Sequence, residues 1–262
     1  MAEITAAMVK ALRDQTGQGM MECKKALQEA GGDVQAAQDI LRKKGLVKAE
    51  QKADRATGEG LIAIKALDGA AVMIEVRCET DFCARNDEFR VMVGRLAELA
   101  AGAPAGEIEP TDEMRQLVQE TLAKIGENMS FTRGIKVEAP RVATYLHHNQ
   151  KVGVILGVDG EIGDDDLSGL CMHVAFANPV GITPDDIPAD AIEKERSFAR
   201  QEAIDSGKPP EIAEKIVTGK VRKFLAERAL VEQNYVRDDK KKVKQVLGGA
   251  TVTAFARFAV GA

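Results

Sequence analysis

The chain of 262 residues contains no tryptophan and few aromatic residues, which make up 4% of the sequence. Base-stacking platforms need aromatic rings and nucleic-acid surfaces are basic, whereas the formal net charge of this chain is −5. No apolar run approaches the roughly 20 residues that a membrane-spanning helix needs. We therefore expect no nucleic-acid partner, no membrane partner and a cytoplasmic location.

The 4 cysteines are scattered through the sequence, at Cys23, Cys78, Cys83 and Cys171. Their spacing is typical neither of a zinc site nor of a disulfide framework. Residues 1–5 lack the basic region and the apolar run of a signal peptide. We expect buried or half-buried thiols in a reducing compartment.

Recognisable catalytic machinery is also missing from the sequence. The histidines His147, His148 and His173 have no metal-ligand partner four residues away and belong to no serine or cysteine triad. The glycine-rich stretch Thr16–Met21 follows a helical pattern and contains no Gly-Lys-Ser/Thr, so it does not predict a phosphate loop. We expect His173 in or beside the core, whereas His147 ends a strand and could reach outward. No catalytic residue, metal or cofactor is expected.

Residues 1–48 have the pattern of a small helical domain. Apolar spacing over residues 4–12 predicts a first helix, and Met21–Glu29 predicts a second. Asp33 predicts the N-cap of a third helix, which Gly45 would end. Three short helices bury little surface, so the domain should be marginally stable, and a charged linker at 49–59 should follow it.

From residue 60 the apolar pattern changes to the alternation of β-strands. Residues 61–67 and 71–78 predict a β-hairpin whose turn is Asp68-Gly69. A helix that starts near Asp87 should follow. The remaining elements of this first core half, 60–139, are a helix over about 112–125 and a strand over 130–138.

The same order of elements is predicted again in a second core half, 140–262. A hairpin over 141–147 and 152–158, a helix over 167–176 and a closing strand over 250–260 repeat the pattern. An insert at about 187–233 should form an antiparallel helical hairpin, with helices at 189–206 and 210–232. The chain is therefore predicted to be an α+β protein with two related core halves.

The segment Thr80-Asp81-Phe82 is the most informative stretch of the chain. It stands between a predicted strand and a predicted helix, where the backbone is held rigidly and a ring beside a carboxylate can project into a partner. Asp81 with Thr80 can instead cap the helix, and Phe82 can pack beneath it, so both interpretations stay open. The pair Met20-Met21 favours a core position over an exposed apolar knob.

Five separated motifs together resemble bacterial elongation factor Ts. They are residues 12–27, 80–86, 125–128, 172–175 and 211–215. The resemblance spans nearly the whole chain, and its first two motifs are specific to that family. It implies that the N-terminal domain is a three-helix, ubiquitin-associated-like module and that the insert is a coiled-coil arm through which some members self-associate.

The resemblance also implies a partner, the GTPase elongation factor Tu, and the residues that contact it. Residues of the N-terminal module would touch the GTPase domain: Arg13, Met20 and Met21. Residues of the core would lie at or beside the magnesium and phosphate site: Thr80, Asp81, Phe82, Cys83, Ile125, Gly126, Asn128 and His147. Phe82 as a rigid wedge would move a helix of the GTPase and disturb the bound Mg²⁺. The implied function is guanine nucleotide exchange without covalent chemistry.

Two departures from the family pattern and two other readings accompany this interpretation. Cys83 replaces an aliphatic residue, and the basic residue that the family often has near Ser168-Gly169 is missing. The chain ends at Ala262, where many members continue with a further helix.

The first alternative is a GTPase-binding or assembly module without exchange activity. The second is an enzyme, for which the sequence offers no paired titratable groups.

Overall fold

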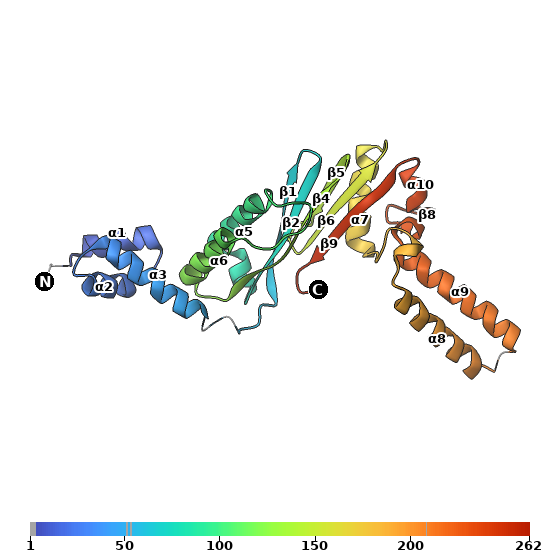
Figure 1. The fold of residues 1–262 in the computed structure, drawn as a ribbon, viewed down its shortest axis with the longest axis horizontal. Helices are drawn as coiled ribbons and strands as arrows, with labels where there is room; N and C mark the ends of the chain where they lie inside the picture. The colour runs from blue at the N-terminus through green and yellow to red at the C-terminus, as the bar shows by residue number, and fades with distance from the viewer. Residues whose placement is uncertain (1–3, 51, 53, 208) are drawn as a thin grey trace.

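The computed structural model describes residues 4–50, 52, 54–207 and 209–262, with the side chains of residues 46–50 outside this description. The molecule is elongated, with a helical domain at one end, a two-helix arm at the other and the β-sheets between them (Figure 1). Two of these sheets form the core, and a small two-stranded sheet pairs β7 (Asn234–Tyr235) with β8 (Asp238–Lys242). The predicted linker and the predicted break between the arm helices lie partly outside the described residues. Within the described part, no helix is long and apolar enough to cross a bilayer.

The N-terminal domain consists of helices α1 (Ala6–Thr16), α2 (Met20–Glu29) and α3 (Val34–Glu50) around a small apolar core. Asp33 accepts a hydrogen bond from the amide of Ala36 at 2.9 Å, which confirms the predicted N-cap. The predicted stop at Gly45 is wrong, because α3 continues to Glu50. A Cβ on Gly45 would lie 2.8 Å from the Cβ of Ala123, so this glycine permits a close helix approach instead.

The first core half places two helices on one face of a four-stranded sheet. The sheet has the order β1-β2-β4-β3, and its predicted hairpin and closing strand are confirmed. Helices α5 and α6 pack on it through a core that includes Phe89, Leu96 and Leu122. The elements are β1 (Glu59–Leu67), β2 (Ala70–Cys78), α4 (Asp81–Arg85), α5 (Asp87–Ala100), β3 (Gly106–Glu107), α6 (Asp112–Ile125) and β4 (Met129–Glu138).

The second core half repeats this layout with a three-stranded sheet, β5-β6-β9. Helix α7 covers its outer face through Leu167, Leu170 and Val174. Its elements are β5 (Arg141–Leu146), β6 (Val152–Asp159), α7 (Asp164–Ala177), the 3-10 turn η1 (Pro184–Asp186), β7 (Asn234–Tyr235), β8 (Asp238–Lys242), α10 (Val243–Leu247) and β9 (Thr251–Ala259).

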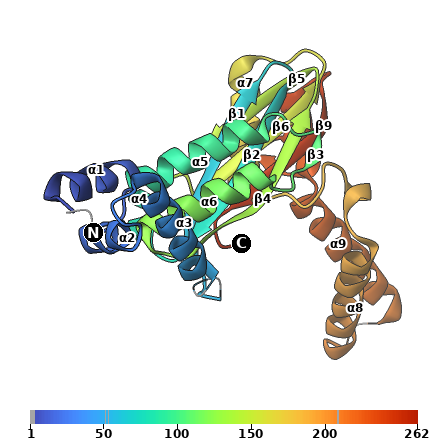
Figure 2. The same cartoon turned by 60° about the vertical axis from the view of Figure 1, so that its left-hand side comes forward.

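The two sheets pack face to face, so the core has four layers in the order helices, sheet, sheet, helix (Figures 1 and 2). The layer between the sheets contains Ile62, Met73, Ile155 and other apolar side chains. Gly153 of β6 permits a close approach, since a Cβ there would be 2.7 Å from a methyl group of Ile62. The inner face of each sheet is therefore buried by the other sheet rather than by helices.

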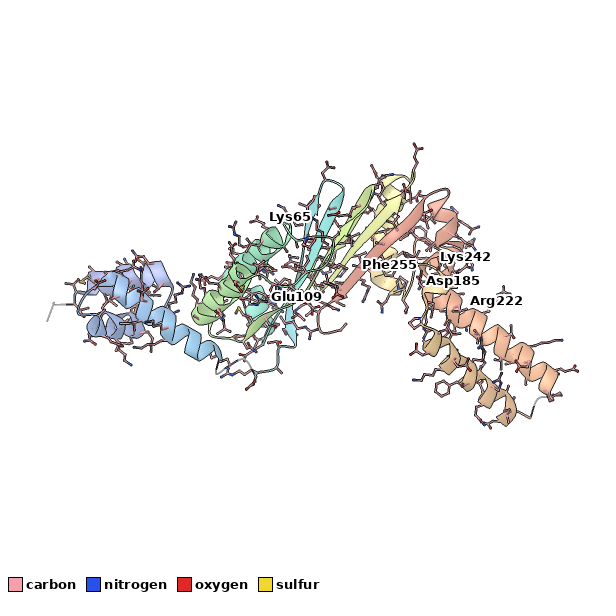
Figure 3. All side chains as sticks on the ribbon, viewed as in Figure 1. Lys65, Glu109, Asp185, Arg222, Lys242 and Phe255 are labelled. Carbon is pink, nitrogen blue, oxygen red and sulfur yellow. The ribbon has the colours of Figure 1, made fainter. Side chains whose placement is uncertain are left out.

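The predicted arm is confirmed as helices α8 (Ala189–Asp205) and α9 (Pro210–Arg228), which pack against each other. The second helix is shorter than predicted, because the chain turns after Arg228 into the 3-10 turn η2 (Leu230–Glu232). Ala199, Ala203 and Val217 are buried between the helices. Other side chains, such as Arg222, project away from the arm into solvent (Figure 3).

Candidate partner-binding site

The turn that follows β2 presents an aromatic ring to solvent. Thr80 has an extended backbone and caps α4, because its hydroxyl oxygen accepts a hydrogen bond from the amide of Cys83 at 3.2 Å. Phe82 is in the first turn of this helix and is 78% exposed. The interpretation of Phe82 as a residue packed beneath the next helix is therefore wrong.

Asp81 lies beside the exposed ring but does not act as the cap. Its carboxylate forms an ion pair with Arg85 at 2.9 Å, one helical turn further on. The short helix α4 precedes the helix that the sequence places near Asp87. That helix, α5, has its own N-cap in Asn86, which accepts from the amide of Glu88 at 2.8 Å. Thr80 and Asn86 thus form two consecutive N-caps, one for each helix.

Two buried thiols support the turn from inside the core. Cys78 donates a hydrogen bond to the carbonyl of Thr80 at 3.3 Å, and Cys83 is only 2% exposed. A hydrogen bond with Cys78, together with burial, raises the pKa of the Cys83 thiol, so the thiol stays protonated at neutral pH. Cys83 therefore faces the core behind Phe82. All four cysteines are buried and free, as the sequence predicts.

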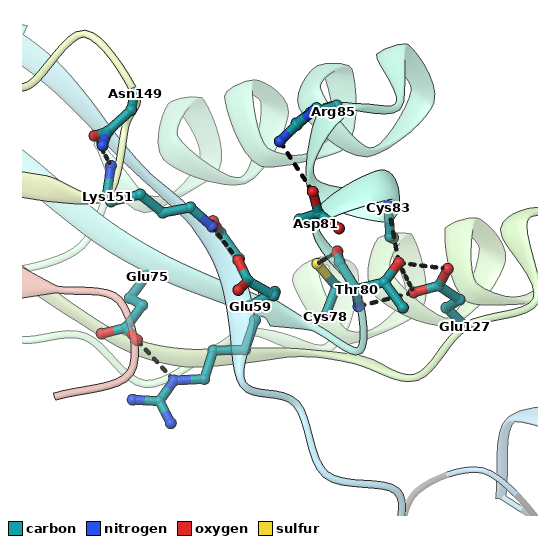
Figure 4. Close-up of polar contacts among 12 residues, drawn as sticks. Glu59, Glu75, Cys78, Thr80, Asp81, Cys83, Arg85, Glu127, Asn149 and Lys151 are labelled. Atoms are coloured by element: carbon teal, nitrogen blue, oxygen red, sulfur yellow. Dashed lines mark hydrogen bonds and ion pairs between the residues drawn. The ribbon is translucent and has the colours of Figure 1, made fainter.

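The loop after α6 is tied to the turn by two carboxylates, of which Figure 4 shows Glu127 beside Thr80. Glu127 accepts hydrogen bonds from the amide of Thr80 at 3.1 Å and from its hydroxyl at 2.9 Å. In the opposite direction, Glu79 accepts from the amide of Asn128 at 2.5 Å and from Arg55 at 3.4 Å. The hydrogen bond from the backbone N–H of Asn128 is the largest cause that lowers the pKa of Glu79 below its ordinary value, and the charge of Arg55 lowers it further.

Sequence reasoning missed Glu79 and Glu127 as parts of the site. Both carboxylates are adjacent in sequence to residues that were singled out, Thr80 and Gly126. The signal that could have found Glu127 is the glycine before it: Gly126 has φ +84° and ends α6, so the next side chain turns away from the helix axis. Nothing in the sequence alone shows that the two loops meet.

His147 stands at the end of β5, beside the turn between β5 and β6. Its Nδ1 lies 2.7 Å from the hydroxyl of Tyr145, and its ring centroid is 4.2 Å from that of His148. The carbonyl of Gln150 in the same turn accepts from the amide of Ile62 at 2.8 Å, which joins this turn to β1. Lys151, which follows this turn, also forms an ion pair with Glu59 at 2.6 Å, and Glu59 pairs with Cys78 at the end of β2. The turn beside His147 therefore lies toward the end of β2 from which the Thr80 turn starts.

The N-terminal domain exposes its methionine pair. Met20 is 42% and Met21 is 63% exposed at the start of α2, so the preference for a core position is wrong. Arg13 is exposed on the preceding helix. The domain is held at the end of α6, where the side-chain amide of Gln18 donates to the carbonyl of Ala123 at 3.0 Å. Lys52 also donates to the carbonyl of Gly126.

His173 is buried, as the sequence predicts, and its ring is held by two neighbours. Nε2 lies 2.9 Å from the side-chain oxygen of Gln233, and Nδ1 accepts from the amide of Val236 at 3.2 Å. Burial is the largest cause that lowers its pKa, which favours the neutral ring at neutral pH. His173 is thus a structural residue of the second core half.

Among the described residues, no group of three or more His, Cys, Asp or Glu side chains is arranged to hold a metal ion. A groove of about 590 Å³ lies between the N-terminal domain and α6. Its lining is mixed and includes Gln15, Gln38, Leu41 and Arg115. The exposed turn at Phe82 lies outside this groove, so the candidate site is a projecting surface rather than a pocket.

Comparison with known proteins decides the family. The model of the family described as elongation factor TS matches residues 79–262. Elongation factor Ts of Idiomarina loihiensis is 44% identical over 98% of this chain and 91% of its own length. The proteins of that name from Actinobacillus succinogenes and Pseudomonas syringae pv. syringae are 45% and 44% identical, each over 100% of this chain and 92% of their own lengths. This chain belongs to the elongation factor Ts family.

Membership of the elongation factor Ts family makes the chain a translation elongation factor. The part matched by the family model begins at Glu79 and includes the Thr80 turn, the loop after α6 and His147. The relatives also align with the N-terminal domain, which carries Arg13, Met20 and Met21. The residues singled out from the sequence thus fall into two surfaces of one elongation factor Ts chain, joined at the end of α6.

Proposed function

We propose that this protein is the guanine nucleotide exchange factor of elongation factor Tu, and that it promotes GDP release by disturbing the Mg²⁺ and phosphate site of that GTPase. The observation that carries the proposal is the exposure of Phe82 on a turn whose backbone is fixed by its neighbours. An aromatic ring that is exposed on a backbone fixed by hydrogen bonds is typical of a binding hot spot, so its position favours a role in binding. Membership of the elongation factor Ts family supports the choice of partner.

Phe82 would act as a wedge, with Asp81 as the carboxylate beside it. A rigid ring loses little conformational freedom on binding, so more of its contact energy is available to move the partner. Mg²⁺ demands near-ideal octahedral geometry, so a small displacement of its ligands strongly weakens the binding of the ion. The weakened ion and the displaced phosphate loop would then release GDP.

The cycle would follow from thermodynamic linkage. If this chain lowers the affinity of elongation factor Tu for GDP, then GDP lowers the affinity of elongation factor Tu for this chain by the same factor. GTP would displace the chain in turn. The chain itself makes and breaks no covalent bond in this proposal, and it acts by preferential binding to the nucleotide-free state.

The methionine pair would provide a second, separate contact. Met20 and Met21 present flexible, polarisable apolar side chains, with the charge of Arg13 on the neighbouring helix. Such a surface suits the apolar face of a partner domain. Its role would be affinity, whereas the role of Phe82 would be displacement of the ion.

The decisive experiment is stopped-flow release of a fluorescent GDP analogue from elongation factor Tu, with and without this chain. We expect strong acceleration by the wild-type chain and a loss of roughly 30-fold in Phe82→Ala, the size of a hot-spot contact. Phe198→Ala is the matched control, because this ring is 62% exposed but lies on the distant α8. Complex formation without faster GDP release would favour the binding module without exchange activity. If the Phe82→Ala variant accelerates release as much as the wild-type chain, the wedge model is refuted.

A further inference from the structure

We propose that Glu79 and Glu127 are positioning residues, which form a reciprocal carboxylate brace that holds the Thr80 turn and fixes the direction of Phe82. This inference rests on the proposed exchange function and deepens it. The brace joins two loops that are 47 residues apart in the chain, as the bond from Thr80 to Glu127 shows. Each loop supplies one carboxylate and one backbone amide to the other.

The turn needs such support because α4 is short. A helix of 5 residues is unstable on its own, since nucleation fixes several residues for each hydrogen bond gained. Phe82 itself is largely in solvent and adds little packing. The direction of the ring is therefore set by the backbone of the turn, which the buried Cys83 anchors in the core and which Glu127 holds at Thr80.

The hydroxyl of Thr80 connects the brace to the helix. It has one proton, which it donates to the carboxylate of Glu127 at 2.9 Å, and its oxygen accepts from the amide of Cys83 at 3.2 Å. Donation to a charged acceptor makes the first bond stronger than a neutral one. Loss of the carboxylate would free the hydroxyl to rotate, and the cap of α4 would weaken with it.

The second carboxylate holds the loop that carries Glu127. Glu79 accepts from the amide of Asn128, and the side-chain amide of Asn128 donates to the carbonyl of Arg55 at 2.8 Å. Arg55 also approaches the Glu79 carboxylate at 3.4 Å. Glu127 is thus fixed between Gly126, which ends α6, and Asn128, which is bound on both its backbone and its side chain.

The brace also lies where the N-terminal domain is attached. Gln18 and Lys52 donate to the carbonyls of Ala123 and Gly126, at the end of the same helix. One loop therefore connects the methionine pair with the Phe82 turn. A partner that touches both surfaces would meet them at a fixed spacing, which lowers the entropy lost on binding.

The first arm of the test measures the turn in the free chain. Amide hydrogen exchange of Cys83 and Ala84 reports the cap of α4, because these amides donate to the hydroxyl and the carbonyl of Thr80. We expect Glu127→Gln to raise their exchange about tenfold, the loss of one charge-assisted bond, while the amides of α5 keep their protection. Unchanged protection at both amides would overturn the brace.

The second arm measures release of the GDP analogue from elongation factor Tu. Glu127→Gln should slow accelerated release about tenfold, and Glu79→Gln should act in the same direction. Glu120→Gln is the matched control, since this exposed glutamate on α6 receives a hydrogen bond from Gln116 and does not belong to the brace. It should leave release unchanged.

A double mutant separates positioning from general damage. If Glu127 acts through the ring, Glu127→Gln should have no further effect in the Phe82→Ala background, whereas independent damage would multiply the two losses. Multiplied losses would overturn the positioning role. A wild-type chain that fails to accelerate GDP release would overturn the exchange function itself. If the wild-type chain accelerates release and the Glu127→Gln variant accelerates it equally, only the brace is overturned.

Discussion

The two core halves have the same frame and differ at the connections that leave it. Each half has a hairpin whose second strand pairs with a closing strand, and each pairing shifts register by one residue near the end of that strand. The shifts lie after Glu75 in β2 and after Gly157 in β6. A shared frame with one specialised connection indicates where function has been added.

The strand-to-helix connections show the clearest difference. In the first half, Thr80 caps α4 with its side chain and is bound by Glu127. In the second half, Gly163 precedes α7 and supplies no side-chain cap. The first connection is fixed and projects a ring, whereas the second follows the glycine directly into a long helix that packs on the sheet.

The residue that precedes each register shift also differs between the two halves. Glu75 is fully buried and accepts from Arg77 and Arg133, each at 2.7 Å. The guanidinium of Arg133 lies 4.3 Å from the ring centroid of Phe258 in β9, so the ionic cluster joins the two sheets. Gly157 occupies the corresponding place and lets neighbouring side chains approach closely. At this one position the first half has an ionic cluster, whereas the second half has a glycine that packs closely against Val137 and Ala139 of the first half.

Removal of the buried charge should give the largest effect. Glu75→Gln leaves two arginines without their anion, and we expect a loss of about 3 kcal/mol in the free energy of unfolding. Chemical denaturation measures it, with Glu109→Gln as the control for charge loss at an exposed site (Figure 3). A loss no larger than that of the control would show that the cluster does not hold the first half.

The frame follows from the sequence because its signals are local. Alternating apolar residues and the Asp68-Gly69 turn predict the first hairpin, and the observed strands confirm it. The continuation of α3 through Gly45 could not be predicted, since its reason is contact with Ala123, far along the chain. For the same reason the candidate residue Phe82 was found from its turn, whereas the brace at Glu127 depends on two loops meeting in space.

The close packing between the two halves can be broken at Gly157 of the second half. A Cβ on Gly157 would lie 2.9 Å from the Cβ of Ala139 and 3.3 Å from a methyl group of Val137. Gly157→Val should therefore cost about 2 kcal/mol in the free energy of unfolding by overpacking. Gly94→Val, where a Cβ would have no neighbour within 4 Å, is the control for loss of a glycine. Equal stability of the two variants would contradict the close-packing explanation.

The fixed connection should respond to loss of its cap. Thr80→Ala removes the oxygen that accepts from Cys83, and we expect a loss of about 1 kcal/mol in the free energy of unfolding. Thr80→Ser keeps the hydroxyl and should recover most of this loss, because both hydrogen bonds can form again. A serine variant as unstable as the alanine variant would mean that the methyl group, and not the hydroxyl, supports the turn.

The smallest expected effect comes from giving the second half the cap that it lacks. Gly163 has φ −63° and ψ 145°, a conformation that serine adopts, and the nearest atom to its added Cβ is 3.8 Å away. Gly163→Ser should gain about 0.5 kcal/mol, partly from the hydroxyl cap and partly from lower entropy of the unfolded chain. Gly163→Ala lowers that entropy without a hydroxyl, so the difference between the two variants measures the cap. If serine gives no gain over alanine, the amides at the start of α7 are already satisfied, and the contrast between the two connections is then a matter of Phe82 and its brace rather than of capping.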